Sequence, residues 1–180
     1  VVLFPAPVWA DIPPDIIHKF EIVVIPQPDG SLVIHYKLDY EATSDFTNDI
    51  PYIQIGVPNS NFTIREWGPT TLLKGAKAIT FGKSLVELDF GRLPKKGERF
   101  QLYFEILQNG MVYKTGEDVS FKFVPGWFDY AKVSELHLTW ALPSDISLVK
   151  SLDPKLVGQF DNRATWITRN LQTNQKAKAV

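Results

Sequence analysis

Apolar and polar residues alternate along most of this chain, which is the period-two pattern of a β-strand that buries one face. The alternation is clearest from Leu32 to Tyr40 and from Phe100 to Ile106. Turn-forming residues such as Pro28-Asp29-Gly30 and Asn109-Gly110 separate the alternating runs. Helical periodicity is hard to find in any segment, so the pattern predicts a fold built from strands.

The turn signals divide the alternation into about ten short strands. The expected strands cover residues 20–24, 32–40, 53–57, 63–67, 76–81, 85–90, 100–106, 119–123, 136–140 and 164–169. Short connections favour strands that run antiparallel to their neighbours. We therefore expect an all-β chain that folds as an antiparallel immunoglobulin-like β-sandwich of about ten strands.

The alternation changes phase in one late segment. The apolar positions are odd at Ala131 and Val133 and become even from Leu136 to Trp140. One extra residue in a strand produces this change, which predicts a β-bulge near Ser134-Glu135. The even phase also places Trp140 in the core.

Residues 1–10, VVLFPAPVWA, differ from the rest of the chain because they are apolar and contain two prolines. Proline removes a backbone donor from a sheet, which disfavours an ordinary first strand here. An apolar run that ends in Val8-Trp9-Ala10 before Asp11 is typical of a signal-peptidase site. We expect residues 1–10 to be a signal-peptide remnant, residues 11–170 to form the sandwich, and residues 171–180 to be a turn that enters a further, truncated strand.

Composition excludes several classes of function. The formal net charge is −1, so no basic field draws in nucleic acid. The chain has no cysteine, which excludes disulfides, thiol nucleophiles and thiolate metal sites. After the first ten residues, no apolar run approaches the roughly 20 residues that a membrane-spanning helix requires.

An aromatic connection follows Pro125-Gly126 between two strand-like runs, and it contains Trp127, Phe128 and Tyr130. Exposed aromatic rings in a loop provide a platform for sugar rings, whereas buried rings close the end of a sandwich. Trp127, Phe128 and Tyr130 are therefore the candidate ligand-binding residues, with packing at the end of the sandwich as the alternative.

Glu87 and Asp89 share one face of an expected strand, as in the Glu-x-Asp strand of sandwich-fold glycosidases. Retaining hydrolysis requires two carboxyls about 5 Å apart, one of which donates a proton. The second glutamate would fall near Gly91 or Arg92, neither of which can donate that proton. We therefore expect a solvated strand face and no catalytic residue.

Other titratable residues offer only alternatives. Asp129 with His137 is the second pair that an enzyme could use, and Glu66 and Glu105 are fallback candidates. An enzyme requires such a pair to meet in one concave pocket.

The histidines and the polar residues near position 45 are the candidates for metal binding. His18, His35 and His137 lie on separate expected strands, without the short spacing of paired metal ligands. Asp45, Asn48 and Asp49 carry oxygen ligands for calcium, but their spacing fits a polar turn better than a calcium loop. We expect no metal and no cofactor.

Three segments together resemble an uncharacterised family of bacterial exported and envelope proteins with a β-rich N-terminal domain. They are Ile53 to Ser60 (IGVPNS within it), Phe121 to Asp129 (FKFVPGWFD), and the strand from Val133 to Trp140. The resemblance implies export from a bacterial cell, a β-rich domain, and in many members a membrane segment further along the protein. It implies no chemical activity.

The expected function is that of a non-catalytic extracytoplasmic interaction or scaffold domain of a bacterial envelope or secreted protein. Its partner would be an unknown protein or a surface glycan, and a membrane anchor could lie outside this chain. One alternative is a carbohydrate-binding module that uses Trp127, Phe128 and Tyr130. A second alternative is a glycoside-active sandwich enzyme.

Overall fold

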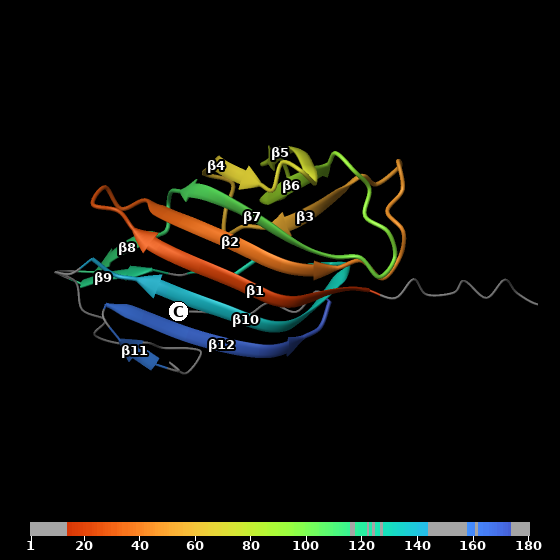
Figure 1. Ribbon diagram of the computed structural model, residues 1–180. Helices are drawn as coiled ribbons and strands as arrows, with labels where there is room; N and C mark the ends of the chain where they lie inside the picture. The colour runs from red at the N-terminus through yellow and green to blue at the C-terminus, as the bar shows by residue number, and fades with distance from the viewer. Residues whose placement is uncertain are drawn as a thin grey trace, which may run out of the picture.

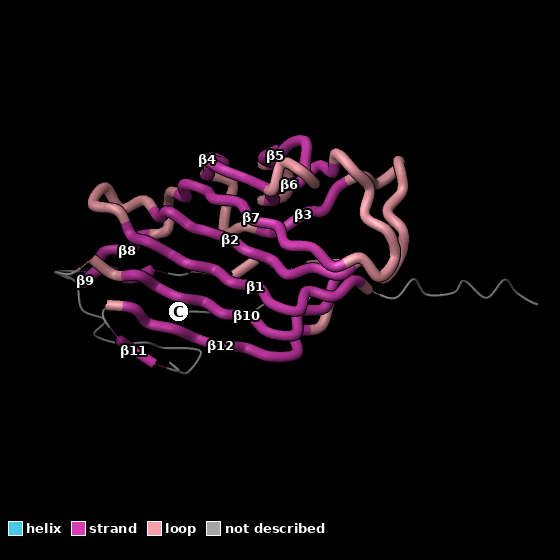
Figure 2. Tube along the Cα trace, viewed as in Figure 1, coloured by secondary structure: helices cyan, strands magenta, loops and turns pink. Residues whose placement is uncertain are grey.

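The computed structural model describes residues 14–115, 118–121, 123, 125–126, 128–143, 158–160 and 162–173. Within these residues the chain forms twelve strands and no helix (Figure 1, Figure 2). The all-β prediction is therefore confirmed for the described part of the chain. No helix long and apolar enough to cross a membrane is found in these residues.

The strands follow one another with short connections through the first two thirds of the chain. They are β1 (Asp15–Pro26), β2 (Leu32–Glu41), β3 (Tyr52–Gly56), β4 (Phe62–Gly68), β5 (Leu73–Ile79), β6 (Leu85–Phe90), β7 (Arg99–Gln108), β8 (Val112–Thr115), β9 (Asp118–Phe121), β10 (Ala131–Ala141), β11 (Gly158–Phe160) and β12 (Arg163–Leu171). β8 and β11 are strands that the alternation did not predict.

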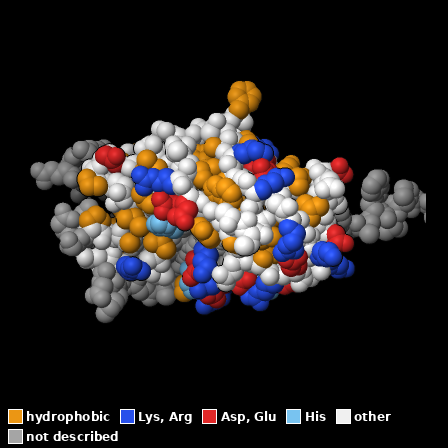
Figure 3. Space-filling view, turned by 45° about the horizontal axis from the view of Figure 1, so that its top comes forward, with side chains coloured by type: hydrophobic (Ala, Val, Ile, Leu, Met, Phe, Trp, Pro, Cys, Tyr) orange, Lys and Arg blue, Asp and Glu red, His pale blue; other side chains and the backbone are white. Residues whose placement is uncertain are grey.

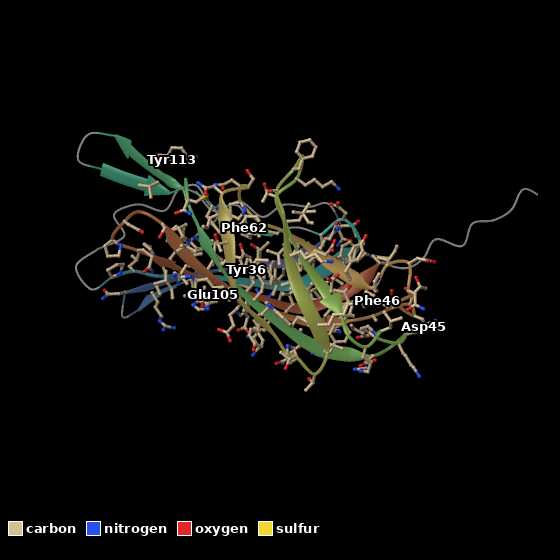
Figure 4. The ribbon with its side chains drawn as sticks, turned by 90° about the horizontal axis from the view of Figure 1, so that it is seen from above. Tyr36, Asp45, Phe46, Phe62, Glu105 and Tyr113 are labelled. Atoms are coloured by element: carbon tan, nitrogen blue, oxygen red, sulfur yellow. The ribbon has the colours of Figure 1, made fainter. Side chains whose placement is uncertain are left out.

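Three sheets result from these strands. Seven strands lie in a large sheet in the order β11-β12-β10-β1-β2-β7-β4, and three lie in a small sheet in the order β3-β6-β5. The chain leaves the large sheet at β3, returns at β4, leaves again for β5 and β6, and returns at β7. The small sheet lies against one face of the large sheet (Figure 1). β8 and β9 form a hairpin that stands away from this sandwich (Figure 4).

The pairing of β1 with β10 is parallel, whereas every other recorded pair of strands is antiparallel. Ile22 lies opposite Leu138, and Val24 lies opposite Trp140. The expectation of a wholly antiparallel sandwich is therefore wrong at this pair. A tight turn forces neighbouring strands to be antiparallel, but the whole of β2 to β9 separates β1 from β10, and a long connection permits either direction.

The core lies between the large and the small sheet. Tyr36 of β2 and Phe104 of β7 stack with ring centroids 4.5 Å apart and an interplanar angle of 9°. Phe90 of the small sheet meets Phe100 of the large sheet edge to face at 5.7 Å. Trp140 is buried, as its phase predicted. Burial of such aromatic and aliphatic side chains is the main favourable term in folding.

The change of phase in β10 is present, but the β-bulge predicted near Ser134-Glu135 is wrong, because the pairing of β10 shows no register shift there. Val133 and Leu136 are both buried, although strict alternation would place them on opposite faces. β10 nevertheless stays in register with β1, from Ile17 opposite Val133 to Phe20 opposite Leu136. The register shift lies between β1 and β2, at Ile17/Lys19. β1 and β10 therefore change phase together, and the irregularity is absorbed where β1 meets β2.

We call residues 123–130 the closing segment; residues 124 and 127 lie outside the described residues. A Cβ atom placed on Gly126 would lie 2.6 Å from the carbonyl oxygen of Gly56 and 3.1 Å from the Cγ2 of Ile55. Phe128 packs edge to face against Phe20, with centroids 5.3 Å apart. Because Gly56 belongs to the small sheet and Phe20 to the large one, the closing segment joins the two layers along the edge of β3.

Replacement of Gly126 by alanine tests this close approach. The added methyl group would meet a backbone oxygen that has little room to move, so we expect Gly126→Ala to lower the free energy of unfolding by about 1 to 3 kcal/mol. Urea denaturation measures the change. Gly75→Ala is the matched control, because its Cβ would meet only Asp89 at 3.7 Å, and we expect a change of less than about 1 kcal/mol. Equal effects of the two substitutions would contradict the proposed contact.

Candidate functional site

The structure separates the three aromatic residues that the sequence offered as ligand-binding candidates. Trp127 lies outside the described residues, Phe128 is buried, and Tyr130 is half-buried. The rings of Phe128 and Tyr130 meet at 85° with centroids 6.3 Å apart, so these two do not form a coplanar platform. The ligand-binding prediction is wrong for Phe128, because its ring packs in the core and leaves no face for a ligand.

The hydroxyl group of Tyr130 completes the outer edge of β3. It donates a hydrogen bond to the carbonyl oxygen of Gln54 and accepts one from the backbone N–H of Gln54, both at 2.9 Å. β3 is the end strand of the small sheet, so these two backbone groups point away from its partner β6. Burial raises the pKa of Tyr130, which keeps the hydroxyl protonated and able to donate. The Tyr130 hydroxyl therefore stabilises the outer edge of β3.

Asp15 ties the start of β1 to the same end of the sandwich. Its carboxylate accepts hydrogen bonds from the hydroxyl of Tyr40 and from the N–H of Thr43, the latter at 2.8 Å. The backbone N–H of Asp15 donates to the carbonyl oxygen of Tyr130 at 3.0 Å. Burial, with smaller effects of Tyr130 and Asp15, raises the pKa of Tyr40. This polar group therefore anchors strands to one another.

Glu87 and Asp89 lie on the outer face of the small sheet, yet both are buried. The Nζ atom of Lys77 lies 2.7 Å from Oδ2 of Asp89 and 3.5 Å from Oε1 of Glu87, and Gln54 donates to Glu87 at 2.8 Å. The hydrogen bond with Asp89 raises the pKa of Lys77. The expectation of a solvated strand face is wrong, because side chains from β3 and β5 cover the carboxylates.

This arrangement does not resemble the site of a retaining glycosidase. Such a site holds the sugar between a proton donor and a nucleophile. Here the ammonium group of Lys77 contacts both Glu87 and Asp89.

The histidines lie on three different strands, as predicted, and each contacts a glutamate on the outer face of the large sheet. A histidine beside a carboxylate on an exposed strand face is an ordinary surface pair. No group of three or more potential metal ligands gathers among the described residues. The pairs are His18–Glu41 at 2.7 Å, His35–Glu105 at 3.0 Å, and His137–Glu135.

The remaining pairs suggested for catalysis do not form a catalytic arrangement. His137 contacts Glu135, and its hydrogen bond lowers the pKa of that carboxyl, whereas Asp129 is exposed. Glu66 and Glu105 lie opposite each other on β4 and β7. Both carboxylates lie on the outer face of the large sheet, where Glu105 contacts His35.

The polar loop near position 45 has a structural contact. Oδ1 of Asp45 accepts a hydrogen bond from the backbone N–H of Lys96 at 2.8 Å. The neighbouring Phe46 packs edge to face against Phe90 at 4.9 Å. Asp45 and Phe46 lie together at one end of the molecule (Figure 4). This loop therefore caps the end of the sandwich.

The outer face of the large sheet carries an uncharged area that the sequence analysis missed. Ile25, Val33 and Leu107 lie side by side across β1, β2 and β7, and Val23 lies opposite Thr139 in the next row. The solvent face of an antiparallel sheet is normally polar, so this area differs from an ordinary solvated face. We call the following residues the aliphatic patch: Val23, Ile25, Val33, Leu107, Thr139, Ala141 and Thr165.

Ion pairs border the aliphatic patch. Glu105 contacts His35 at 3.0 Å and Arg65 at 3.7 Å, and Glu135 contacts Arg169 at 3.3 Å. Figure 3 shows hydrophobic side chains gathered at the left of the molecule beside histidine, acidic and basic side chains. An apolar centre with a polar border of both signs is the usual composition of a protein interface.

One signal in the sequence pointed to the aliphatic patch. The run Ile22-Val23-Val24-Ile25 is apolar in both phases of its alternation, and Val33 is apolar on the polar side of its strand. Strands that are covered on both faces are apolar on both faces, so this run indicated an apolar outer face on β1 and β2.

Comparison with known proteins adds no relative. A scan against models of protein families finds no match, and a search of curated proteins finds none either.

The two tyrosines at positions 130 and 36 provide a matched test of the closing segment. Tyr130→Phe removes the partner of two backbone groups, so we expect the free energy of unfolding to fall by about 1 to 3 kcal/mol. Tyr36 is buried, but its hydroxyl has no hydrogen-bond partner within the described residues. We therefore expect Tyr36→Phe to leave the free energy of unfolding unchanged or to raise it. Thermal and urea unfolding of both variants measure the difference, and a larger loss for Tyr36→Phe would refute this assignment.

Proposed function

We propose that this chain is a non-catalytic interaction or scaffold domain that docks a protein partner through the aliphatic patch. The observation that carries the proposal is an uncharged patch on the outer face of a seven-stranded sheet, bordered by paired charges. Its residues are half-buried, except Val33, which is buried. The aliphatic side chains of the patch offer no hydrogen bonds to a sugar, and the hydroxyls of Thr139 and Thr165 pair with each other at 3.1 Å. Such a surface suits the apolar centre of a protein interface.

The polar groups of the chain support a non-catalytic role. Glu87 and Asp89 form ion pairs with Lys77, and Asp15 accepts a hydrogen bond from the Tyr40 hydroxyl. A catalytic carboxyl works on a substrate when it lies within reach of the substrate's reacting atoms. These carboxylates instead hold strands together.

We further propose that the sandwich is immunoglobulin-like at the level of architecture. The order β1-β2-β7-β4 beside β3-β6-β5 supports this, since constant-type immunoglobulin domains also place a four-stranded sheet against a three-stranded one. The order of the strands along the chain differs from that of a constant-type immunoglobulin domain, because here the strand between β2 and β4 is the seventh in the chain. The large sheet is also extended by β10, β12 and β11.

The proposed location is outside the cytoplasm of a bacterial cell, in a secreted or envelope protein. The apolar residues 1–10 and the resemblance of residues 53–60 and 121–129 to exported bacterial proteins support it. Residues 1–10 lie outside the described residues.

Photo-crosslinking in the native host tests docking through the aliphatic patch. A benzoylphenylalanine probe at Thr139 should yield a discrete crosslinked protein, because the probe would lie inside the interface. Val23→Glu, opposite Thr139, should abolish this product by placing a charge in the apolar centre. A probe at Lys83, which is exposed on the β5–β6 turn of the small sheet, is the control and should not yield the product. The same product from Lys83, or a product insensitive to Val23→Glu, would refute docking at this patch.

A further inference from the structure

Tyr103 lies in an unusual position on the outer face of the large sheet. It is on β7 directly opposite Gly68 of β4. A Cβ atom placed on Gly68 would lie 2.5, 2.6 and 2.7 Å from the Oη, Cζ and Cε1 atoms of Tyr103. The hydroxyl oxygen and two adjacent ring carbons lie at nearly equal distances, so that point is out of the ring plane, at the hydroxyl end of the ring. One side of the phenol ring, at its hydroxyl end, therefore covers the glycine.

The opposite face of the Tyr103 ring is turned to solvent. The residue is 41% exposed, although the face over Gly68 is covered. A ring that lies flat on a sheet presents its open face parallel to the sheet, as a stacking platform requires. Two other candidate rings, those of Phe128 and Tyr130, are perpendicular to each other, so they do not offer such a surface.

Polar side chains surround this open ring face. Lys37 lies opposite Tyr103 on β2, and Gln101 and Glu105 lie two residues before and after it on β7. Glu66 lies opposite Glu105 on β4. Lys37, Gln101 and Glu66 are exposed, so donors and acceptors are available on three sides of the ring.

We propose that the open face of Tyr103 is a stacking site for a pyranose ring of a neutral oligosaccharide, with Lys37, Gln101 and Glu66 binding its hydroxyl groups. A gluco-configured pyranose in β-1,4 linkage carries its substituents equatorially, so its axial C–H bonds form a flat apolar face. That face matches the phenol ring, and the equatorial hydroxyls point to the surrounding polar groups.

This site goes beyond docking of a protein at the aliphatic patch. Tyr103 belongs to the row of Gly68 and Lys37, whereas the patch is centred on the rows of Val23 and Ile25. The two proposals rest on different residues and different ligand chemistry, so either can fail without the other.

Titration of the purified domain with cellohexaose and with chitohexaose tests the proposal. We expect one of these oligosaccharides to bind with a dissociation constant of about 0.1 to 1 mM, as measured by calorimetry, which corresponds to a shallow site with one ring. Tyr103→Ala should weaken binding at least about tenfold, and Tyr103→Phe should change it less than about threefold, because phenylalanine keeps the ring. Gln101→Ala should also weaken binding, because it removes a polar partner of the sugar and leaves the ring over Gly68 in place.

Tyr113→Ala is the matched control, because Tyr113 is 50% exposed on β8 and lies outside the platform. It should leave the dissociation constant unchanged. The ring of Tyr103 also shields Gly68 from solvent. If that were its only role, Tyr103→Ala would lower the melting temperature, and the wild-type domain would bind neither oligosaccharide. Absence of binding up to about 10 mM, or binding that persists undiminished in a folded Tyr103→Ala variant, overturns the proposal.

Discussion

The two hydrogen bonds between the Tyr130 hydroxyl and the backbone of Gln54 are the interaction on which the two-layer structure depends. β3 ends the small sheet, and its outer backbone groups need partners. Among the described residues, no further strand pairs with this edge. A single side chain does so, at 2.9 Å to both groups, and thereby caps the edge.

The same segment also joins the layers by packing. Gly126 lies against the carbonyl oxygen of Gly56 in the small sheet, and Phe128 lies against Phe20 in the large one. Asp15 adds a link from the first strand to the backbone of Tyr130. Hydrogen bonds and apolar contacts act here at one place, so the architecture explains the positions of Phe128 and Tyr130.

The outer face of the large sheet carries both of the surfaces that we propose for binding. Its two parts have different chemistry. The aliphatic patch suits a protein interface, whereas the flat ring of Tyr103 on Gly68 and its polar neighbours suit a sugar. A scaffold or envelope domain that holds both a protein and a glycan would use these two parts side by side.

Most of the strands could be predicted from the sequence, because alternation records which side chains face the core. β2 and β7 followed their predicted phases, and Trp140 is in the core. The direction of pairing could not be predicted at β1 and β10, because alternation is the same in parallel and antiparallel strands. β11 is too short to show a pattern, and β8 has too few residues to show more than one cycle.

The site was harder to predict than the fold. An aromatic string after Pro125-Gly126 looks the same whether its rings are exposed or buried, and the burial of Phe128 depends on contacts with Phe20, which is distant in sequence. The outward position of Tyr103 follows from its strand's alternation. Its glycine partner does not, because β4 pairs with β7 through a register shift between Ile64 and Glu66.

Amide hydrogen exchange at Gln54 tests the central claim most directly. If the Tyr130 hydroxyl caps β3, the Gln54 amide exchanges slowly in the wild-type domain although it lies on the outer edge of its sheet. In Tyr130→Phe the Gln54 amide exchanges much faster, whereas the Phe104 amide in β7 keeps its protection. Fast exchange of the Gln54 amide in the wild-type domain would contradict the claim.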